Sequence, residues 1–176
     1  MAAAFRPGHI DTPIAATKLA LKGLAQRHLL LAAELATLDA ELARITAKVA
    51  PKLHALNGVG SDVAGAILVA LGDNTERLRS EASFARLSGV APLPASSGKT
   101  TGRHRLNPGG DRGANNALWR IVITRLARSH EPTLAYVARR TEEGLSKREI
   151  VRCLKRYVAR EVYHAVVPAK DLSEAA

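Results

Sequence analysis

The sequence has one cysteine, Cys153, and aromatic residues make up only 3% of its 176 residues. A single cysteine excludes an internal disulfide and suits a reducing cytosol. No apolar run approaches the roughly 18–20 residues that span a bilayer, and residues 1–10 lack the apolar core of a signal peptide. An H-E-x-x-H motif, a pair of cysteines and an ordered acidic cluster are also missing. These absences predict a cytoplasmic protein with no membrane partner and with no metal site or cofactor of its own.

Apolar residues nevertheless make up 47% of the chain, and most of them are alanine, leucine or valine. With so few aromatic residues, this composition favours packed helices over a sheet. At this length the chain can form one modest core, or a small domain with an extended arm. We expect an all-α fold in which a long N-terminal coiled-coil arm precedes a compact helical domain. That domain would contain a helix-hairpin-helix and a long loop rich in glycine, proline and serine.

The net charge of +10 is unevenly distributed along the chain. Residues 99–176 contain sixteen basic and eight acidic residues, so most of the excess lies in this second part. A basic region on a small domain is typical of nucleic-acid binding. A basic surface that only confers solubility is the alternative that charge alone leaves open.

Residues 12–50 have the pattern of a long helical arm, and residues 1–11 before it are expected to be disordered. The helix is predicted to start at Asp11-Thr12-Pro13, where a capping side chain precedes a proline. Apolar residues and one histidine recur in this helix at spacings of three and four, which places them along one seam. They are Leu21, Leu24, His28, Leu31, Leu35, Leu38, Leu42, Ile45 and Val49. The seam predicts a coiled coil that makes a homo-oligomer through residues 21–49. Packing of this helix on the chain's own domain is the alternative.

Residues 53–71 have the order of a helix-hairpin-helix. Gly58 and Gly60 would form a tight turn, and Ser61 would cap the second helix. In this motif the backbone N–H groups at the start of the second helix bind a phosphate without reading bases. The three residues are therefore candidates for nucleic-acid binding, and a plain helical hairpin with a glycine turn is the alternative.

Residues 89–112 contain five of the 13 glycines and three of the eight prolines. Such a segment cannot be the interior of a helix and would make a poor central strand, so we expect a long functional loop. We call it the serine loop, after Ser96 and Ser97. Gly98-Lys99-Thr100 imitates the end of a P-loop, but the glycine that motif needs is replaced by Leu93. Ser96-Ser-Gly-Lys99 fits the S-x-x-K nucleophile motif, but Gly98 disfavours the helix it requires.

Residues 113–167 are expected to form basic helices, followed by a frayed tail at 168–176. Ser146-Lys-Arg-Glu149 has the form of a capping box, and Ile150, Leu154, Val158 and Val162 would face inward. Six cations on this last helix would mostly face elsewhere and could follow a phosphate backbone. They are Lys147, Arg148, Arg152, Lys155, Arg156 and Arg160.

The order of these parts resembles one family. Gly89-Val-Ala-Pro92, Ser96-Ser-Gly-Lys99 and Arg103-His-Arg-Leu-Asn-Pro-Gly-Gly-Asp-Arg112 lie between the helix-hairpin-helix and the basic helices. This set resembles the C-terminal transposase domain of the transposases typified by insertion sequences 110, 116 and 902, over about residues 51–167. The resemblance implies a recombinase that uses a serine together with a RuvC-like domain and is guided by a structured bridge RNA. It implies DNA and guide RNA as partners, in association with a bacterial nucleoid.

The resemblance also implies roles for single residues. The family's nucleophilic serine directly precedes a glycine, which corresponds to Ser97 here, with Ser96 as its rival. Arg103, Arg105 and Arg112 are expected to stabilise charge on the phosphate, and Lys99 or His104 to move a proton. Asn107 matches a polar turn that approaches the nucleic-acid backbone.

The family's RuvC-like domain, with carboxylates that hold a divalent metal such as magnesium, has no counterpart in this sequence. We therefore expect a truncated member that acts in insertion-sequence DNA transposition but is inactive alone, or that completes its site with another polypeptide. A non-catalytic helix-hairpin-helix module for nucleic-acid binding and dimerisation is the alternative.

Overall fold

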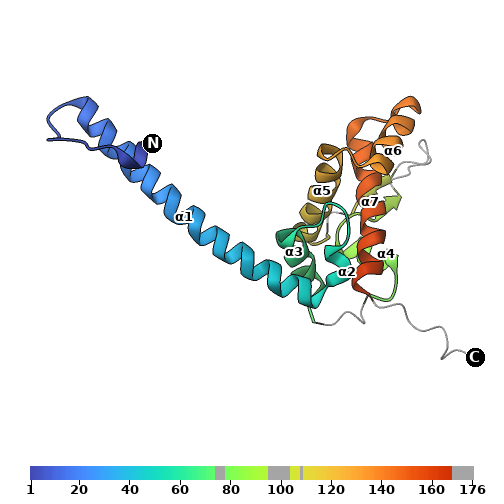
Figure 1. Ribbon diagram of the computed structural model, residues 1–176. Coiled ribbons are helices and arrows are strands. Elements are labelled where there is room, and N and C mark those ends of the chain that lie inside the picture. The colour runs from blue at the N-terminus through green and yellow to red at the C-terminus, as the bar shows by residue number, and fades with distance from the viewer. Residues whose placement is uncertain (74–77, 95–103, 108, 168–176) are drawn as a thin grey trace, which may run out of the picture. The chain divides into compact units, whose positions relative to one another are not determined.

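A computed structural model of the chain describes residues 1–73, 78–94, 104–107 and 109–167. Within these ranges it has seven α-helices, one 3-10 turn and two three-residue strands (Figure 1). The prediction of a helical fold is therefore confirmed. The chain divides into two compact units, residues 1–42 and 43–176, which are described separately below. In the described part of the chain no helix is long and apolar enough to cross a membrane.

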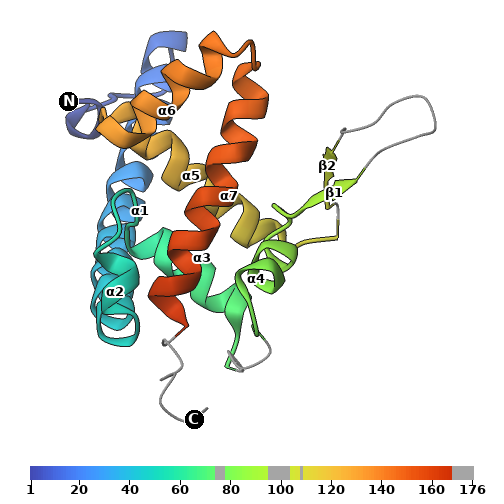
Figure 2. The same cartoon turned by 90° about the vertical axis from the view of Figure 1, so that its right-hand side faces the viewer.

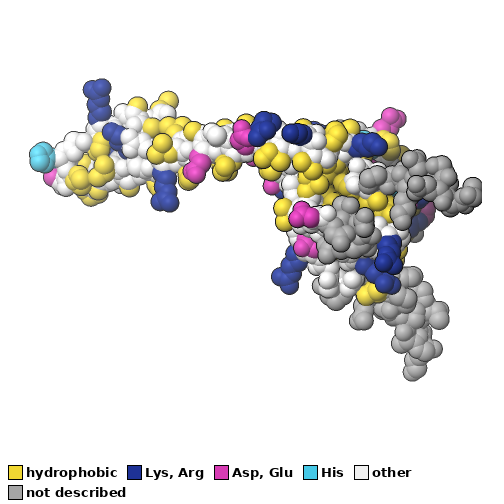
Figure 3. All heavy atoms as spheres, turned by 90° about the horizontal axis from the view of Figure 1, so that it is seen from below, with side chains coloured by type: hydrophobic (Ala, Val, Ile, Leu, Met, Phe, Trp, Pro, Cys, Tyr) yellow, Lys and Arg dark blue, Asp and Glu magenta, His cyan; other side chains and the backbone are white. Residues whose placement is uncertain are grey.

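The first unit is dominated by helix α1 (Pro13–Val49), which continues into the second unit. A short 3-10 turn, η1 (Ala2–Ala4), precedes it. The predicted start is confirmed, because the Thr12 hydroxyl oxygen accepts a hydrogen bond from the backbone N–H of Ala15, at 3.2 Å. Figure 3 shows hydrophobic side chains along the visible face of this segment. The exposed leucines of the unit are Leu19, Leu21, Leu24, Leu29, Leu30, Leu31, Leu35 and Leu38.

The second unit begins with the last turns of α1 and the short helix α2 (Pro51–His54). The predicted arm ends at residue 50, and Pro51 starts α2, where its missing N–H costs nothing. The buried hydroxyl of Thr46 lies 2.7 Å from the Nε2 atom of His54, which holds the two helices together. Leu53 of α2 is fully buried in the core.

Helix α3 (Ser61–Leu71) follows a turn, and its start differs from the expectation for Ser61. The capping position is occupied by Gly60, whose carbonyl accepts the N–H of Ala64, and Ser61 is already inside the helix. Glycine is among the residues that occur at the N-cap position of helices, and Gly60 has the extended backbone typical of that position. The helix ends at Gly72, which has φ of +64°.

Helices α5 (Arg112–Ala127), α6 (Glu131–Glu142) and α7 (Lys147–Val166) complete the core with α3 and the short helix α4 (Glu81–Leu87) (Figures 1 and 2). The predicted inward positions on α7 are confirmed, because Ile150, Leu154, Val158 and Val162 are all buried. The capping box is also confirmed. The Ser146 hydroxyl accepts the N–H of Glu149, while the Glu149 carboxylate accepts the N–H of Ser146.

Arg125 of α5 joins three parts of the second unit. Its side chain is almost fully buried, and its Nε donates to the carbonyl of Asn57, at 2.8 Å, in the turn before α3. Its two terminal nitrogens bind both carboxylate oxygens of Glu161 on α7, at 3.1 and 2.6 Å. Such a bidentate pair fixes direction as well as distance. The turn at 55–60 is therefore held in place by a buried cation.

The serine loop contains regular structure that its composition did not predict. Helix α4, which Ser80 caps, leads into strand β1 (Pro92–Pro94). This strand pairs antiparallel with β2 (His104–Leu106), with Leu93 opposite Arg105. We call the pair of strands β1 and β2 the ribbon, and Figure 2 shows that it extends away from the helices. Both strands are edges, so each proline can leave its missing N–H on the unpaired side.

Candidate nucleic-acid interface

The two ends of the serine loop cross in direct contact at Gly89 and Gly110. Gly89 has φ of +64°, and a Cβ on Gly110 would overlap the backbone N and Cα of Gly89. The N–H of Asp111 donates to the carbonyl of Leu87, at 2.6 Å, which closes the crossing. Only a residue without a side chain fits at Gly110. We call this crossing the root of the ribbon.

A partly open pocket of about 460 Å³ lies at this root. One wall is a stripe along the first turns of α5, formed by Arg112, Asn115, Asn116 and Trp119. These positions follow the i, i+3, i+4, i+7 spacing that places residues on one face of a helix. The other walls are formed by Gly89, Asn107, Gly110 and Lys155 of α7.

Three of the predicted nucleic-acid-binding residues therefore meet in one place. Asn107, Arg112 and Lys155 come from the end of the ribbon, the start of α5 and the middle of α7. Asn107 is held in a local turn, because its Oδ1 accepts the N–H of Gly109 at 3.1 Å. Arg112 is exposed at the first turn of α5. Asp111 caps that helix by accepting the N–H of Ala114 at 2.7 Å.

Lys155 is the exception among the cations of α7, because only 7% of it is exposed. Its Nζ donates to the Oδ1 of Asn115, at 2.9 Å. The Nδ2 of Asn115 in turn donates to the carbonyls of Ser88, at 2.8 Å, and Gly89, at 3.3 Å. Burial, and to a smaller extent the positive charge of Arg152, lower the pKa of Lys155 below its usual value. A buried ammonium is thus fixed to the pocket wall by an amide that also supports the root.

Three residues of the pocket were not predicted as site residues, namely Asn115, Asn116 and Trp119. Their helical spacing from Arg112 was visible in the sequence, as was the fact that Trp119 is the chain's single tryptophan. What the sequence did not show is that the N-terminal part of this face is uncovered at the root. Trp119 remains 45% exposed although it is a large apolar side chain.

The proposed nucleophiles lie on the segment that joins the paired ends of the ribbon. Pro94 pairs with His104, and residues 95–103 connect them. Ser96, Ser97, Lys99 and Arg103 fall in this connection and lie outside the described residues. His104 and Arg105 belong to β2, so the backbone of two further predicted residues is placed on the ribbon.

The predicted helix-hairpin-helix residues lie together at the turn before α3. Gly58 has φ of +84° and lies against α5, where an added Cβ would come within 3.0 Å of the Ile121 carbonyl oxygen. Gly60 is exposed, with no atoms near the position of its missing Cβ. At the start of α3, Asp62 forms an ion pair with Arg120 of α5. The carboxylate of Asp62 already occupies the positive end of this helix, which disfavours a second anion there.

The cations of α7 do not form one continuous face. Arg152 lies close enough to Lys155 to influence its charge. Arg160 and His164 instead contact Glu81 of α4, at 3.2 and 2.8 Å, and Arg156 also acts on this carboxylate. The hydrogen bond from His164 and the nearby arginines lower the pKa of Glu81. Some of the cations predicted to follow a phosphate backbone therefore contact the protein itself.

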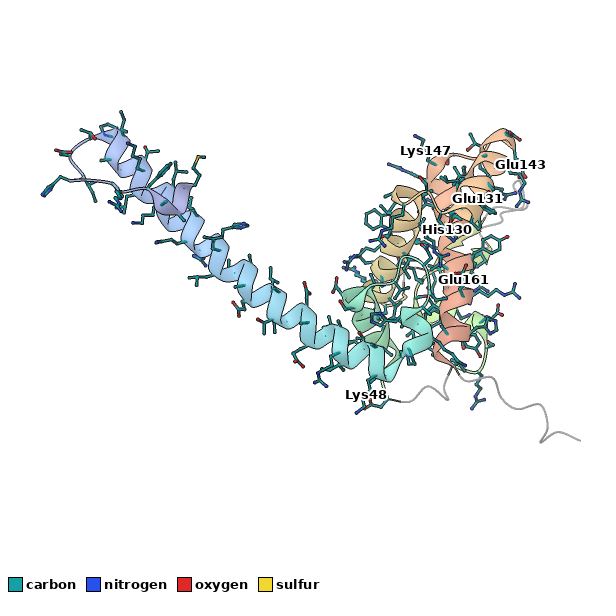
Figure 4. All side chains as sticks on the ribbon, viewed as in Figure 1. Lys48, His130, Glu131, Glu143, Lys147 and Glu161 are labelled. Atoms are coloured by element: carbon teal, nitrogen blue, oxygen red, sulfur yellow. The ribbon has the colours of Figure 1, made fainter. Side chains whose placement is uncertain are left out.

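Lys147 and Arg148 remain exposed at the other end of α7 (Figure 4). In Figure 4 Lys147 marks the start of the helix and Glu161 lies further along it. Arg139 and Arg140 at the end of α6 pair with Glu143, the first at 3.9 Å. Lys147 and Arg148 form no ion pair with a carboxylate of the described residues, so they offer a small basic surface.

No group of three or more histidine, cysteine, aspartate or glutamate side chains in the described ranges could hold a metal ion. The divalent metal implied by the family therefore has no ligand set among these residues.

Comparison with known proteins gave one match to a family model. The model described as the transposase IS116/IS110/IS902 family matches residues 50–138, which is about half of the chain. The matched range includes α3, both strands of the ribbon, the serine loop and α5. A search of curated proteins found no match. The pocket lies within this range except for Lys155, which α7 supplies.

Proposed function

Because the chain belongs to the IS116/IS110/IS902 family of transposases, we propose that it binds DNA at the root of the ribbon and provides Ser97 as the nucleophile of strand exchange. One observation supports this most directly. The pocket gathers Asn107, Arg112 and Lys155 beside the ribbon whose paired strands hold both ends of the segment with Ser97. Cations that converge at the base of the loop that carries a candidate nucleophile suit a phosphodiester substrate.

The proposed reaction is an exchange of phosphate esters. The Ser97 Oγ attacks the phosphorus atom, a new Oγ–P bond forms, and the bond from phosphorus to one deoxyribose oxygen breaks. The serine proton is lost to a base, for which Lys99 or His104 is proposed, and the leaving oxygen takes up a proton. A hydroxyl of a second DNA end then attacks the phosphoserine, joins the strands and releases Ser97.

The positive charges at the root have a defined part in this proposal. Charge accumulates on the phosphate oxygens as the Oγ–P bond forms, and fixed cations lower the energy of that state. Arg112 is exposed at the pocket, while the position of Lys155 is fixed by Asn115. A preorganised lysine needs no rearrangement when the charge appears. Arg103 and Arg105 are proposed to act from the ribbon side.

Salt dependence tests whether the basic residues contact DNA phosphates. We expect the affinity for duplex DNA to fall steeply with salt, and the double variant Lys147→Gln/Arg148→Gln to flatten the log–log slope by about 2. The measurement is fluorescence anisotropy of a labelled duplex at several salt concentrations. Lys22→Gln/Arg27→Gln in α1 is the matched control, since it removes the same charge from the arm. Equal slopes for all three proteins would contradict contact at the start of α7.

We also propose that α1 associates with a second copy of the chain, and that a structured guide RNA is a further partner. The guide RNA rests on the family resemblance alone. The association rests on the leucines of the arm, because Leu31, Leu35 and Leu38 are each about half exposed and follow coiled-coil spacing. A second copy would bury this face.

The state of association can be measured by sedimentation or light scattering. The wild-type chain should give a multiple of 18.7 kDa, and the double variant Leu31→Asp/Leu38→Asp should give the monomer mass, because charges in a coiled-coil seam prevent its burial. Ala36→Asp, at an exposed position off the seam, is the control and should remain associated. A wild-type monomer at all concentrations would overturn the proposal.

A further inference from the structure

We propose that the pocket at the root of the ribbon binds one unpaired nucleotide of the DNA substrate. Its base would stack on Trp119 and its phosphate would bind Lys155 and Arg112. This inference rests on the proposed function and names the form of DNA that the site takes. Three features of the pocket support it: the exposed indole, the buried ammonium and the volume.

Trp119 is the aromatic surface of the pocket. The chain has one tryptophan and only 3% aromatic residues, yet this indole is 45% exposed and lines a pocket instead of the core. Base stacking on an aromatic side chain needs the face of the base, and every base has one. Inside a duplex both faces are covered by neighbouring bases. Trp119 can therefore stack only with a base that has left the duplex.

Lys155 provides a reason for an anion in the same pocket. An ammonium has three N–H donors, and the described residues supply one acceptor for it, the Oδ1 of Asn115. Only 7% of Lys155 is exposed, and the positive charge of Arg152 repels its ammonium. A buried charge with incomplete hydrogen bonding is unfavourable. A phosphate in the pocket would accept the remaining bonds and offset the repulsion.

The dimensions and the remaining side chains suit a nucleotide. A volume of about 460 Å³ is in the range of roughly 300–1,000 Å³ that holds small organic ligands. Asn115 and Asn116 bring amides, which can donate to and accept from the edge of a base. A phosphate alone would leave the indole unused, and a purely apolar ligand would leave Lys155 unpaired. One nucleotide uses both.

The experiment compares three labelled DNA probes of the same length with the full chain. One is fully paired, one has a single bulged thymidine, and one has an abasic sugar-phosphate in place of that thymidine. Affinity and the fluorescence of Trp119 are measured together, because the indole is the only tryptophan in the chain. We expect the bulged probe to bind at least about fivefold tighter than the other two, as stacking of one base provides. Only this probe should quench the fluorescence.

Two variants locate the effect. Trp119→Leu replaces a half-exposed side chain and should remove the preference for the bulge, so that the bulged probe binds no tighter than the abasic one. Arg112→Gln should lower the affinity for the bulged probe more than the affinity for the paired probe. Arg128→Gln, at the exposed C-terminal end of α5, removes the same charge and should change the two affinities equally.

The outcomes separate this inference from the proposed function. Equal affinity for all three probes, with unchanged fluorescence, would overturn the nucleotide pocket while DNA binding itself stands. A bulged and an abasic probe that bind equally well would show a phosphate site without a base site, and would also overturn it. If none of the probes binds, the proposed function fails together with the inference.

Discussion

Replacing Ser97 by alanine is expected to lower the rate of DNA strand joining by at least about 10³-fold, because it removes the hydroxyl that forms the covalent phosphate ester in the proposed reaction. The affinity for DNA should remain within a factor of two or so, since a hydroxyl contributes little beside the charge contacts that dominate binding. The assay measures joined product on a gel. It supplies donor and target DNA, a guide RNA and the RuvC-like domain that the family resemblance implies.

Ser96→Ala is the matched control, because it removes the same group from the neighbouring position. It should retain most of the activity. If Ser96→Ala loses activity and Ser97→Ala keeps it, the nucleophile is Ser96. If the double variant Ser96→Ala/Ser97→Ala joins strands as fast as the wild type, neither serine is the nucleophile. The chain then acts as a nucleic-acid-binding and dimerisation module.

Gly110→Ala is expected to lower the free energy of unfolding by about 1–3 kcal/mol, as overpacking of a rigid contact does. The new methyl group would meet the backbone of Gly89 and lie 3.0 Å from the carbonyl oxygen of Leu87. Backbone atoms cannot rotate away as a side-chain end can. The root must therefore open, and the bond from the Asp111 N–H to Leu87 should weaken with it.

Gly109→Ala is the control for this prediction, because its Cβ would make only an ordinary contact, at 3.5 Å from the Oδ1 of Asn107. Chemical denaturation followed by circular dichroism gives the free energy of unfolding for each variant. The pocket should be affected as well, so Gly110→Ala should also lose the preference for a bulged nucleotide. Equal stability of the two variants would contradict the close crossing at the root.

The helices could be predicted from the sequence because their signals are local. The capping box at Ser146 and Glu149 needs only residues three apart, and Gly72 ends α3 through its own positive φ. The inward face of α7 follows from the spacing of Ile150, Leu154 and Val158. Ser61 was assigned wrongly as a cap because glycine, one position earlier, serves equally well there.

The candidate site was only partly predictable, because it depends on contacts between distant segments. Gly110 meets Gly89 across 21 positions, and nothing in the local sequence of either indicates this. Lys155 follows Leu154 directly and has no periodic signal that marks it as buried. It points inward because the Oδ1 of Asn115, 40 positions earlier, accepts a hydrogen bond from its Nζ. The stripe from Arg112 to Trp119 did have a local signal, namely its helical spacing.

In the proposed reaction, Ser97 forms a covalent bond with a DNA phosphate. The most direct measurement is mass spectrometry of the full chain after reaction with DNA, guide RNA and a RuvC-like domain, followed by denaturation and nuclease digestion. We predict a peptide that contains Ser97 with the added mass of a nucleotide phosphate, and no adduct in Ser97→Ala. Strand joining that proceeds with no adduct on Ser97 at any time point would contradict the claim.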